Sequence, residues 1–364
     1  MAVFTWQNKA TTLGTTKFME KFLEQPLPIG IDAIIKLGTP VNDRATGAKK
    51  FDTFNIRRGL LPGGTMRHQP ETEQVQENDT EEDFTHGTVW EYANSYDFTQ
   101  KADDLAEFEV EDWIAQKAAE NINHSKAQIY LHAILTDTNC FYTPTSAASG
   151  TFDCDGTVST AVGASFNEFH HREIVDQLCQ WQTPLTNGRL LAFGRFGAFR
   201  HLYETFRALG MYTDKSIITG RDVPIVYNTE FHEINLTTPM DIGANGVTDT
   251  TPVAGRTAYT ANTEQNWFGN YVLNAINFNE VLYVSAQDLL YVNMPHVPKV
   301  WYNESPDGGR HKWYGWNMLL GAKSPYDETF NGAATPYVTP PAQRGRVRSL
   351  LVTGANAAGT IMVY

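Results

Sequence analysis

The chain has 364 residues, of which 41% are hydrophobic and 19% are charged, and its formal net charge at pH 7 is −13. The apolar content is sufficient for a packed core, so disorder is not expected over most of the chain. Because nucleic-acid clamps need basic side chains against phosphates, the acidic balance disfavours such a clamp, although it does not exclude a surface that merely faces nucleic acid.

Cysteine content and hydropathy exclude two further classes of protein. The three cysteines, Cys140, Cys154 and Cys179, have no Cys-x-x-Cys spacing, which argues against a disulfide framework and against a zinc site. The first residues lack the basic start and apolar run of a secretion signal, and no apolar run approaches about 18 residues. We therefore expect a soluble protein, made in the cytoplasm, that does not act at a membrane.

The first 40 residues contain closely spaced helix-interrupting residues, among them Pro26, Pro28, Gly30 and Pro40. This spacing predicts an extended arm with at most one short helix, near residues 17–24.

Residues 51–100 combine strand-forming ends with a polar centre. Ile56, Val89 and Trp90 are β-formers, and the stretch LPGGTMRHQP between the ends favours turns. A block over residues 71–83 has seven carboxylates and no Lys or Arg: Glu71, Glu73, Glu77, Asp79, Glu81, Glu82 and Asp83. Since a hairpin this long and polar has no core of its own, we expect it to lie on another part of the assembly.

Residues 103–137 contain neither Gly nor Pro and predict one long helix, about 50 Å at 1.5 Å per residue. Asp103 and Asp104 are suitable N-cap residues. Apolar residues recur in a slowly drifting row, at Val110, Ile114, Ala118, Ile122, Ile129 and Ala133. Without Leu heptads a coiled coil is not indicated, and the row predicts a helix buried along one narrow face, as if it crossed the back of a sheet.

Shorter elements follow in the second half of the chain. The pattern predicts a helix over 165–181, a strand over 189–194, a helix over 196–209 and a buried strand over 225–227. Residues 236–266 are rich in Thr, Gly, Asn and Pro and are typical of a surface insertion. Strands return after residue 266, and the chain ends in a predicted hairpin around the turn GANAAG.

Two short motifs are candidate chemical sites. The sequence TFDCDGTV places Asp153 and Asp155 in a D-x-D-G-T pattern found in a class of phosphatases, but the loop TSAASG precedes it where that site needs a buried strand. A hydrolase using Asp153 and Asp155 is therefore a minor alternative. In EFHHRE the adjacent His170 and His171 lack the i, i+4 spacing of helical metal ligands, so we expect a surface or interface role for them.

The charge pattern suggests contacts between copies of the chain. Arg344, Arg346 and Arg348 alternate, so on a strand they share one face. The hypothesis is that the acidic excursion of one subunit rests on the arginine face of a neighbour, with Arg57, Arg58 and Arg67 contributing further positive charge. Two independently solvated faces are the alternative.

The order of these parts resembles a tailed-bacteriophage major capsid protein of the Hong Kong 97 (HK-97) type. NGRLLAFGRFGAFRHLYE, ITGRDVPIVYNTEF and NWFGNYVLNAIN are similar to loose patterns of that family. The resemblance implies an α+β fold with an N-terminal arm (1–40), an E-loop with flanking strands (41–100) and a P-domain (101–164) whose spine helix is 103–137. It further implies an A-domain with interleaved P-domain elements and the inserted loop 236–266 (165–330), followed by C-terminal P-domain strands (331–364).

The same resemblance implies a structural protein, not an enzyme, without cofactor or metal. Such a chain would assemble with itself into pentamers and hexamers of an icosahedral phage head around double-stranded DNA. Its expected partners are a scaffolding protein, a portal protein and packaged DNA bound non-specifically at the inner face, with a cement protein as a further candidate. Assembly would take place in the host cytoplasm and the mature location would be the virion. Another virion component, such as a cement or tail protein, remains an alternative.

Overall fold

The computed structural model describes residues 29–41, 53–59, 82–100, 110–136, 140–153, 166–181, 188–194, 225–234, 270–273, 276–285, 289–304, 310–324 and 349–355, together with residues 183, 185, 199 and 202. Within these ranges the chain mixes helices with three sheets, of five, eight and two strands. The mixed helix and strand content agrees with the predicted α+β class.

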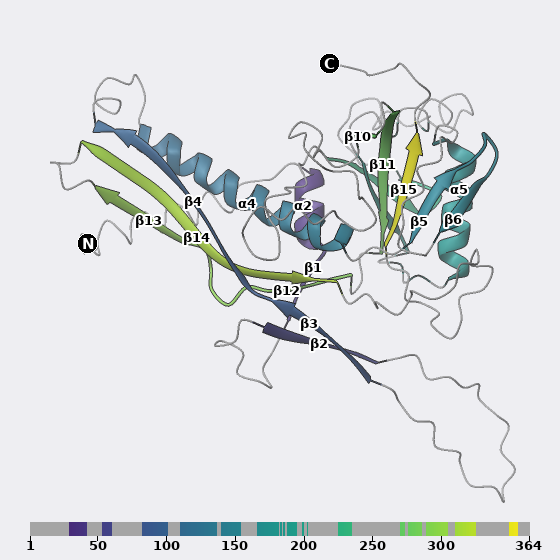
Figure 1. The fold of residues 1–364 in the computed structure, drawn as a ribbon, viewed down its shortest axis with the longest axis horizontal. Helices are drawn as coiled ribbons and strands as arrows, with labels where there is room; N and C mark the ends of the chain where they lie inside the picture. Colours follow the sequence, from purple (N-terminus) through teal and green to yellow (C-terminus); the bar gives the residue numbers. More distant parts are fainter. Residues whose placement is uncertain are drawn as a thin grey trace, which may run out of the picture.

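The five-stranded sheet is organised around one long strand, β14 (His311–Lys323). β14 pairs antiparallel with β4 (Trp90–Thr99), β13 (Lys299–Glu304) and β12 (Leu290–Asn293), and β12 pairs in parallel with β1 (Gly38–Pro40). The ladder between β4 and β14 runs without interruption from His311 opposite Thr99 to Leu320 opposite Trp90. Figure 1 shows these strands as a long, narrow platform.

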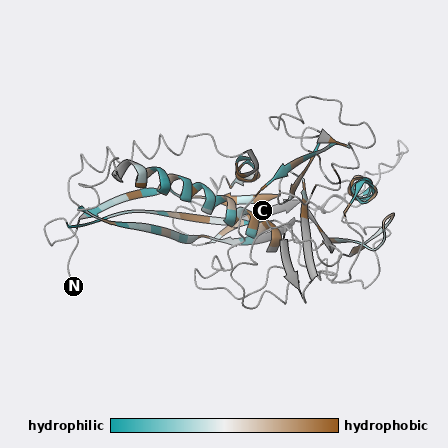
Figure 2. Ribbon diagram, turned by 90° about the horizontal axis from the view of Figure 1, so that it is seen from above, coloured by the Kyte–Doolittle hydropathy of each residue, from teal (hydrophilic) through white to brown (hydrophobic). Residues whose placement is uncertain are grey.

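The helix α4 (Val110–Thr136) lies along one side of this platform, as Figure 2 shows from above. It falls within the range 103–137 predicted from the sequence; residues 103–109 lie outside the described part. Alanines on its inner face, including Ala118 and Ala119, are buried with Trp316 and Met318 of β14 in one core. Because alanine adds little bulk, the helix backbone can approach the sheet closely.

The short helix α2 (Ile29–Lys36) corrects the expectation of an extended arm. Ile31, Ile34 and Leu37 are buried in the same core as α4, so tertiary packing outweighs the helix-interrupting tendency of Gly30. Gly38 follows directly and begins strand β1. The helix expected near residues 17–24 lies outside the described residues.

The eight-stranded sheet forms the second part of the molecule. Its strands are β6 (Gly150–Asp153), β5 (Phe141–Pro144), β15 (Ser349–Ala355), β11 (Ile276–Val284), β7 (Leu190–Gly194), β9 (Thr229–Glu233) and β8 (Ile225–Val226), with β10 (Asn270–Leu273) also paired to β11. Pairing is mixed, since β5 with β15 and β7 with β9 are parallel pairs. The predicted strand 189–194 is confirmed.

The helix α5 (Glu168–Gln180) packs against this sheet and confirms the helix predicted over 165–181. Its residues Ile174 and Leu178 share a second core with Tyr142 of β5 and Tyr283 of β11. The predicted strand 225–227 is one residue shorter, because Tyr227 and Asn228 form the turn into β9 with positive φ angles of 46° and 58°. Of the helix predicted over 196–209, only Phe199 and Leu202 are described, and both are buried.

The two-stranded sheet consists of β2 (Thr53–Gly59) and β3 (Glu82–Thr88) and extends away from both larger sheets (Figure 1). The sequence predicted one hairpin over all of 51–100. That prediction is wrong for residues 90–99, because β4 pairs with β14 over its whole length. In the described part of the chain, no helix has the length and apolar character needed to cross a membrane.

Candidate functional site

The base of the β2–β3 hairpin is anchored on the five-stranded sheet. Phe54 and Ile56 are almost completely buried, with 1% and 2% of their surfaces exposed. The Phe54 ring reaches Gly321 of β14, where an added Cβ would stand 2.7 Å from a ring carbon. Two buried apolar side chains and a close approach at Gly321 therefore fix the direction in which the hairpin leaves the body.

Charged residues of the hairpin are paired by its backbone register. Arg58 stands opposite Asp83, Gly59 opposite Glu82 and Arg57 opposite Phe84. The register thus places the backbone positions of Arg58 and Asp83 opposite each other within one chain, whereas the hypothesis drawn from the sequence sets Asp83 against arginines of a neighbouring chain.

The remaining predicted interface residues lie outside the described part of the chain. They are Arg67, Glu71, Glu73, Glu77, Asp79, Glu81, Arg344, Arg346 and Arg348. The structure therefore does not test whether the acidic excursion meets the C-terminal arginines, and that contact stays a prediction.

A row of exposed aromatic residues can bind sugars, and β13 and β14 carry Trp301, Trp313 and Trp316. Trp316 is only 2% exposed and lies in the core beneath α4. Trp301 lies over Gly315, and Trp313 is stacked with His311, whose imidazole is 3.7 Å from the Asp97 carboxylate. These contacts favour packing within the sheet over a row of free aromatic faces.

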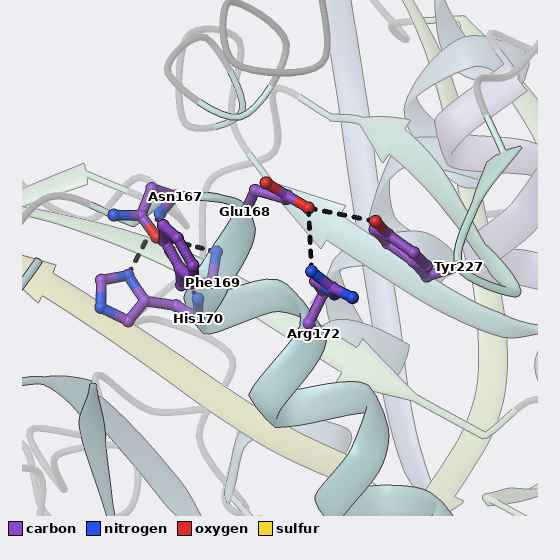
Figure 3. Close-up of polar contacts among 6 residues, drawn as sticks. All are labelled: Asn167, Glu168, Phe169, His170, Arg172 and Tyr227. Atoms are coloured by element: carbon purple, nitrogen blue, oxygen red, sulfur yellow. Dashed lines mark hydrogen bonds and ion pairs between the residues drawn. The ribbon is translucent and has the colours of Figure 1, made fainter. Parts of the chain in front are cut away.

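The start of α5 carries a polar cluster that joins separate parts of the eight-stranded sheet. Tyr227 donates a hydrogen bond of 3.0 Å to the Glu168 carboxylate, which also lies 3.6 Å from Arg172 (Figure 3). The Arg172 guanidinium stands 5.2 Å from the centre of the Tyr227 ring. The three side chains hold the left-handed turn between β8 and β9 against the helix.

Asn167 and His170 form a reciprocal cap at the N-terminus of α5. The Asn167 side-chain oxygen accepts from the backbone N–H groups of Phe169 and His170, and the His170 ring accepts from the backbone N–H of Asn167 (Figure 3). This reciprocal arrangement satisfies N–H groups that lack partners within the helix. The signal was visible in the sequence as Asn167 followed three residues later by a side chain able to accept.

The surface role expected for His170 and His171 is wrong, because both side chains are fully buried at 0% exposure. The His171 ring contacts the Tyr283 hydroxyl at 2.7 Å and the Val226 carbonyl at 3.3 Å. Burial lowers the pKa of His171 to about 4, against an opposing effect of the Val226 carbonyl. Adjacent helical positions point in different directions, so each histidine reaches a different neighbouring element.

Glu173 links α5 to the other edge of the sheet. Its carboxylate accepts from the Tyr142 hydroxyl at 2.5 Å and from the Gly150 backbone N–H at 3.2 Å. Burial and this hydrogen bond both raise the pKa of Tyr142 above its ordinary value. The first two turns of α5 are therefore bonded to the β5–β6 hairpin, to β11 and to the β8–β9 turn.

The alternative hydrolytic site finds little support in the described residues. Asp153 ends the four-residue strand β6, which lies at the edge of its sheet, and Asp155 is outside the described part. A phosphatase of that type needs its first aspartate at the end of a buried strand. Across the described ranges, no three His, Cys, Asp or Glu side chains gather closely enough to hold a metal ion.

Comparison with known proteins shows which solved structures have a similar fold. No protein-family model matches the sequence, and no curated protein sequence matches it. The capsid structure of Helicobacter pylori bacteriophage KHP30 is similar over 98% of this chain and 95% of that chain, with a TM-score of 0.58 and 10% identity. The capsid structure of cyanophage P-SCSP1u is similar over 88% and 87%, with a TM-score of 0.54 and 9% identity.

The head structure of Helicobacter pylori bacteriophage KHP40 gives a third likeness, over 83% of this chain and 84% of that chain, with a TM-score of 0.51 and 11% identity. At such low identity the likeness concerns the fold. The chain has the fold of a bacteriophage capsid subunit, over nearly its whole length. The resemblance inferred from the order of elements is confirmed at that level.

Proposed function

We propose that this chain is the structural major capsid protein of a tailed bacteriophage, and that it assembles with itself into the pentamers and hexamers of an icosahedral head enclosing double-stranded DNA. The observation that carries the proposal is the similarity to the KHP30 capsid chain, because it covers almost all of both chains and leaves no large part of this chain for another activity. On this view the protein is not an enzyme.

The architecture fits the mechanical demands of a shell. A closed shell of identical chains needs wide, stiff subunits, and α4 packed on its long sheet would serve as the spine helix of an HK-97-type subunit. The β2–β3 hairpin with its connecting segment would be the E-loop. Its two described strands pair with each other, and a two-stranded hairpin is marginal alone, which supports a role in contacts with a neighbouring subunit.

Further partners follow from the same proposal. A scaffolding protein would guide assembly, a portal protein would occupy one vertex, and residues 236–266 would offer a platform for a cement protein. With a net charge of −13, the subunit would face packaged DNA without holding it tightly. The working location of the protein would be the virion, after assembly in the host cytoplasm.

Electron microscopy of the purified full-length chain tests the proposal. The chain is produced alone and together with candidate scaffolding proteins, and particles are imaged in negative stain. Closed shells, or rings of five and six subunits, are the expected products. A single small oligomer under every condition would contradict the capsid function and return attention to a cement or tail protein.

The predicted contact between subunits has its own test. We expect Arg346→Glu with Arg348→Glu to block assembly while leaving the subunit folded, because reversed charges would repel the acidic excursion of a neighbour. Lys299→Glu serves as the matched control, since Lys299 is exposed at the first residue of β13. Normal shells from the arginine variant would exclude this contact, while failure of both variants would point to a general effect of charge.

A further inference from the structure

The hydrogen bonds of His170 define the protonation state of its ring. Nε2 lies 2.8 Å from the Ser146 carbonyl oxygen, which can only accept, so Nε2 carries the hydrogen. Nδ1 lies 3.2 Å from the backbone N–H of Asn167, which can only donate, so Nδ1 carries none. Only the neutral Nε2–H form of His170 satisfies both neighbours.

His171 has the same form for a related reason. Its Nε2 faces the Val226 carbonyl oxygen at 3.3 Å and therefore donates. Its Nδ1 lies 2.7 Å from the Tyr283 hydroxyl and accepts from it. The Tyr283 hydroxyl can turn and accept instead, but a charged imidazole would then stand in a site that water does not reach.

The two rings connect α5 to different elements of the sheet. His170 holds the turn between β5 and β6 through Ser146, and His171 holds β8 through Val226 and β11 through Tyr283. A protonated ring places a second N–H against the Asn167 N–H in the first case and buries a charge in the second. Protonation of either ring therefore favours separation of α5 from its neighbours.

We propose that His170 and His171 form an acid-sensitive latch, which holds α5 against the β5–β6 and β8–β9 hairpins while both rings are neutral and releases it when they are protonated. This histidine latch is a property of the subunit fold and does not depend on the proposed capsid function. Acid would act first at α5 and leave α4 on its own sheet in place, because α4 packs in a separate core.

The ionisable and aromatic groups around the two rings come from α5 itself and from the strands packed against it. On α5 itself, the Glu168 carboxylate accepts from Tyr227 and the Glu173 carboxylate accepts from Tyr142 and from the Gly150 backbone N–H. The β5 strand presents Tyr142 to His170, β11 presents Tyr283 to His171, and β9 presents the uncharged Phe231 ring to His171. Arg172 is engaged with Glu168 and Tyr227, and would repel an imidazolium nearby.

Hydrogen exchange measured by mass spectrometry on the full-length, unassembled chain tests the latch. Exchange is followed at about pH 7.5 and about pH 5, after correction for the intrinsic pH dependence of amide exchange. We expect protection of the amides in α5 and at Gly150 to fall by about tenfold or more relative to those of α4 at the lower pH. A parallel loss of protection in α4 and α5, or none in either, would overturn the proposal.

A double variant separates titration from packing. His170→Gln with His171→Gln keeps polar side chains that do not titrate. In this variant α5 is expected to be less protected at neutral pH than in the native chain, and its protection should be the same at neutral and at acid pH. His296→Gln is the control, since His296 is exposed between β12 and β13 and its variant should behave as the native chain does. Persistence of the acid response in the double variant would refute the latch.

A spectroscopic measurement covers the case in which the double variant does not fold. Nitrogen-15 spectra of the native chain with labelled histidine distinguish the Nε2–H tautomer from the charged ring. The His171 ring should remain in the Nε2–H form on acidification until α5 loses its protection. If the His171 ring becomes charged while α5 stays protected, the proposal is wrong.

Discussion

The aromatic ring of Phe54 on β2 lies directly over Gly87, its register partner on β3. A methyl group at position 87 would overlap the ring, so only glycine allows the ring to occupy this place. The ring is 1% exposed and also lies against Gly321 of β14. One side chain thus closes the base of the hairpin and joins it to the five-stranded sheet.

We expect Gly87→Ala to loosen the hairpin, because overpacking a well-filled site costs about 1–3 kcal/mol. Phe54→Ala should cost about 3–5 kcal/mol, through the cavity that it leaves. The double variant should be less destabilised than the sum of the two, since the new methyl group enters the space that the ring vacates. Urea unfolding of all four chains measures this coupling. Strict additivity would show that the ring and the glycine do not share one packed site.

The long helix, α5 and strand β7 could be predicted from the sequence because their signals are local. An apolar row over residues 110–133 and a lack of Gly and Pro determine α4 without reference to the rest of the chain. The overall class of fold followed from the order of such elements. The turn-favouring stretch that begins at Leu61 likewise indicated where β2 ends.

The parts that could not be predicted depend on contacts distant in sequence. Nothing near residues 90–99 indicates that β4 pairs with β14 instead of extending the hairpin. The helix α2 forms despite Gly30 because Ile31 and Ile34 meet α4. His170 and His171 look like surface residues until Ser146, Val226 and Tyr283 supply their partners. Packing decided each of these cases against a local tendency.

The inner face of α4 should tolerate no added bulk. Ala118 is fully buried against the platform, so Ala118→Leu is expected to lower the free energy of unfolding by about 1–3 kcal/mol. Gln116→Leu is the matched control: position 116 is exposed on the same helix, and a surface change there should alter stability by about 0.5 kcal/mol or less. Thermal and urea unfolding measure both variants. An equal effect at the two positions would contradict close packing between α4 and the sheet.

The turn between β8 and β9 holds two non-glycine residues in the left-handed region, Tyr227 at φ 46° and Asn228 at φ 58°. Asn228 is exposed, so its substitution tests the backbone alone. Asn228→Gly should be neutral or stabilise the chain by a few tenths of a kcal/mol, because glycine adopts positive φ angles without steric strain. Asn228→Val should destabilise it by about 1–2 kcal/mol, because β-branched residues avoid positive φ. Urea unfolding ranks the two variants, and the reverse order would rule out a left-handed turn at this position.

Stability should fall in acid through His171. Its pKa is lowered from an ordinary value of 6.5 to about 4 in the folded chain, so folding favours the neutral ring. The stabilisation is fully present above about pH 6.5, declines as the pH falls from about 6.5 to about 4, and is lost below about pH 4. A difference of this size corresponds to roughly 3 kcal/mol for a fully buried ring. Urea unfolding midpoints measured across this window report the slope directly.

His171→Gln should remove most of that slope while lowering stability at neutral pH, because glutamine does not titrate and fills the site less well. Any slope that remains in this variant would come from other titrating groups of the chain. His296→Gln should leave the slope unchanged, since His296 is exposed in both states. If the His171 variant kept the full slope, the acid sensitivity of the chain would arise from other groups, and the buried ring would have no part in it.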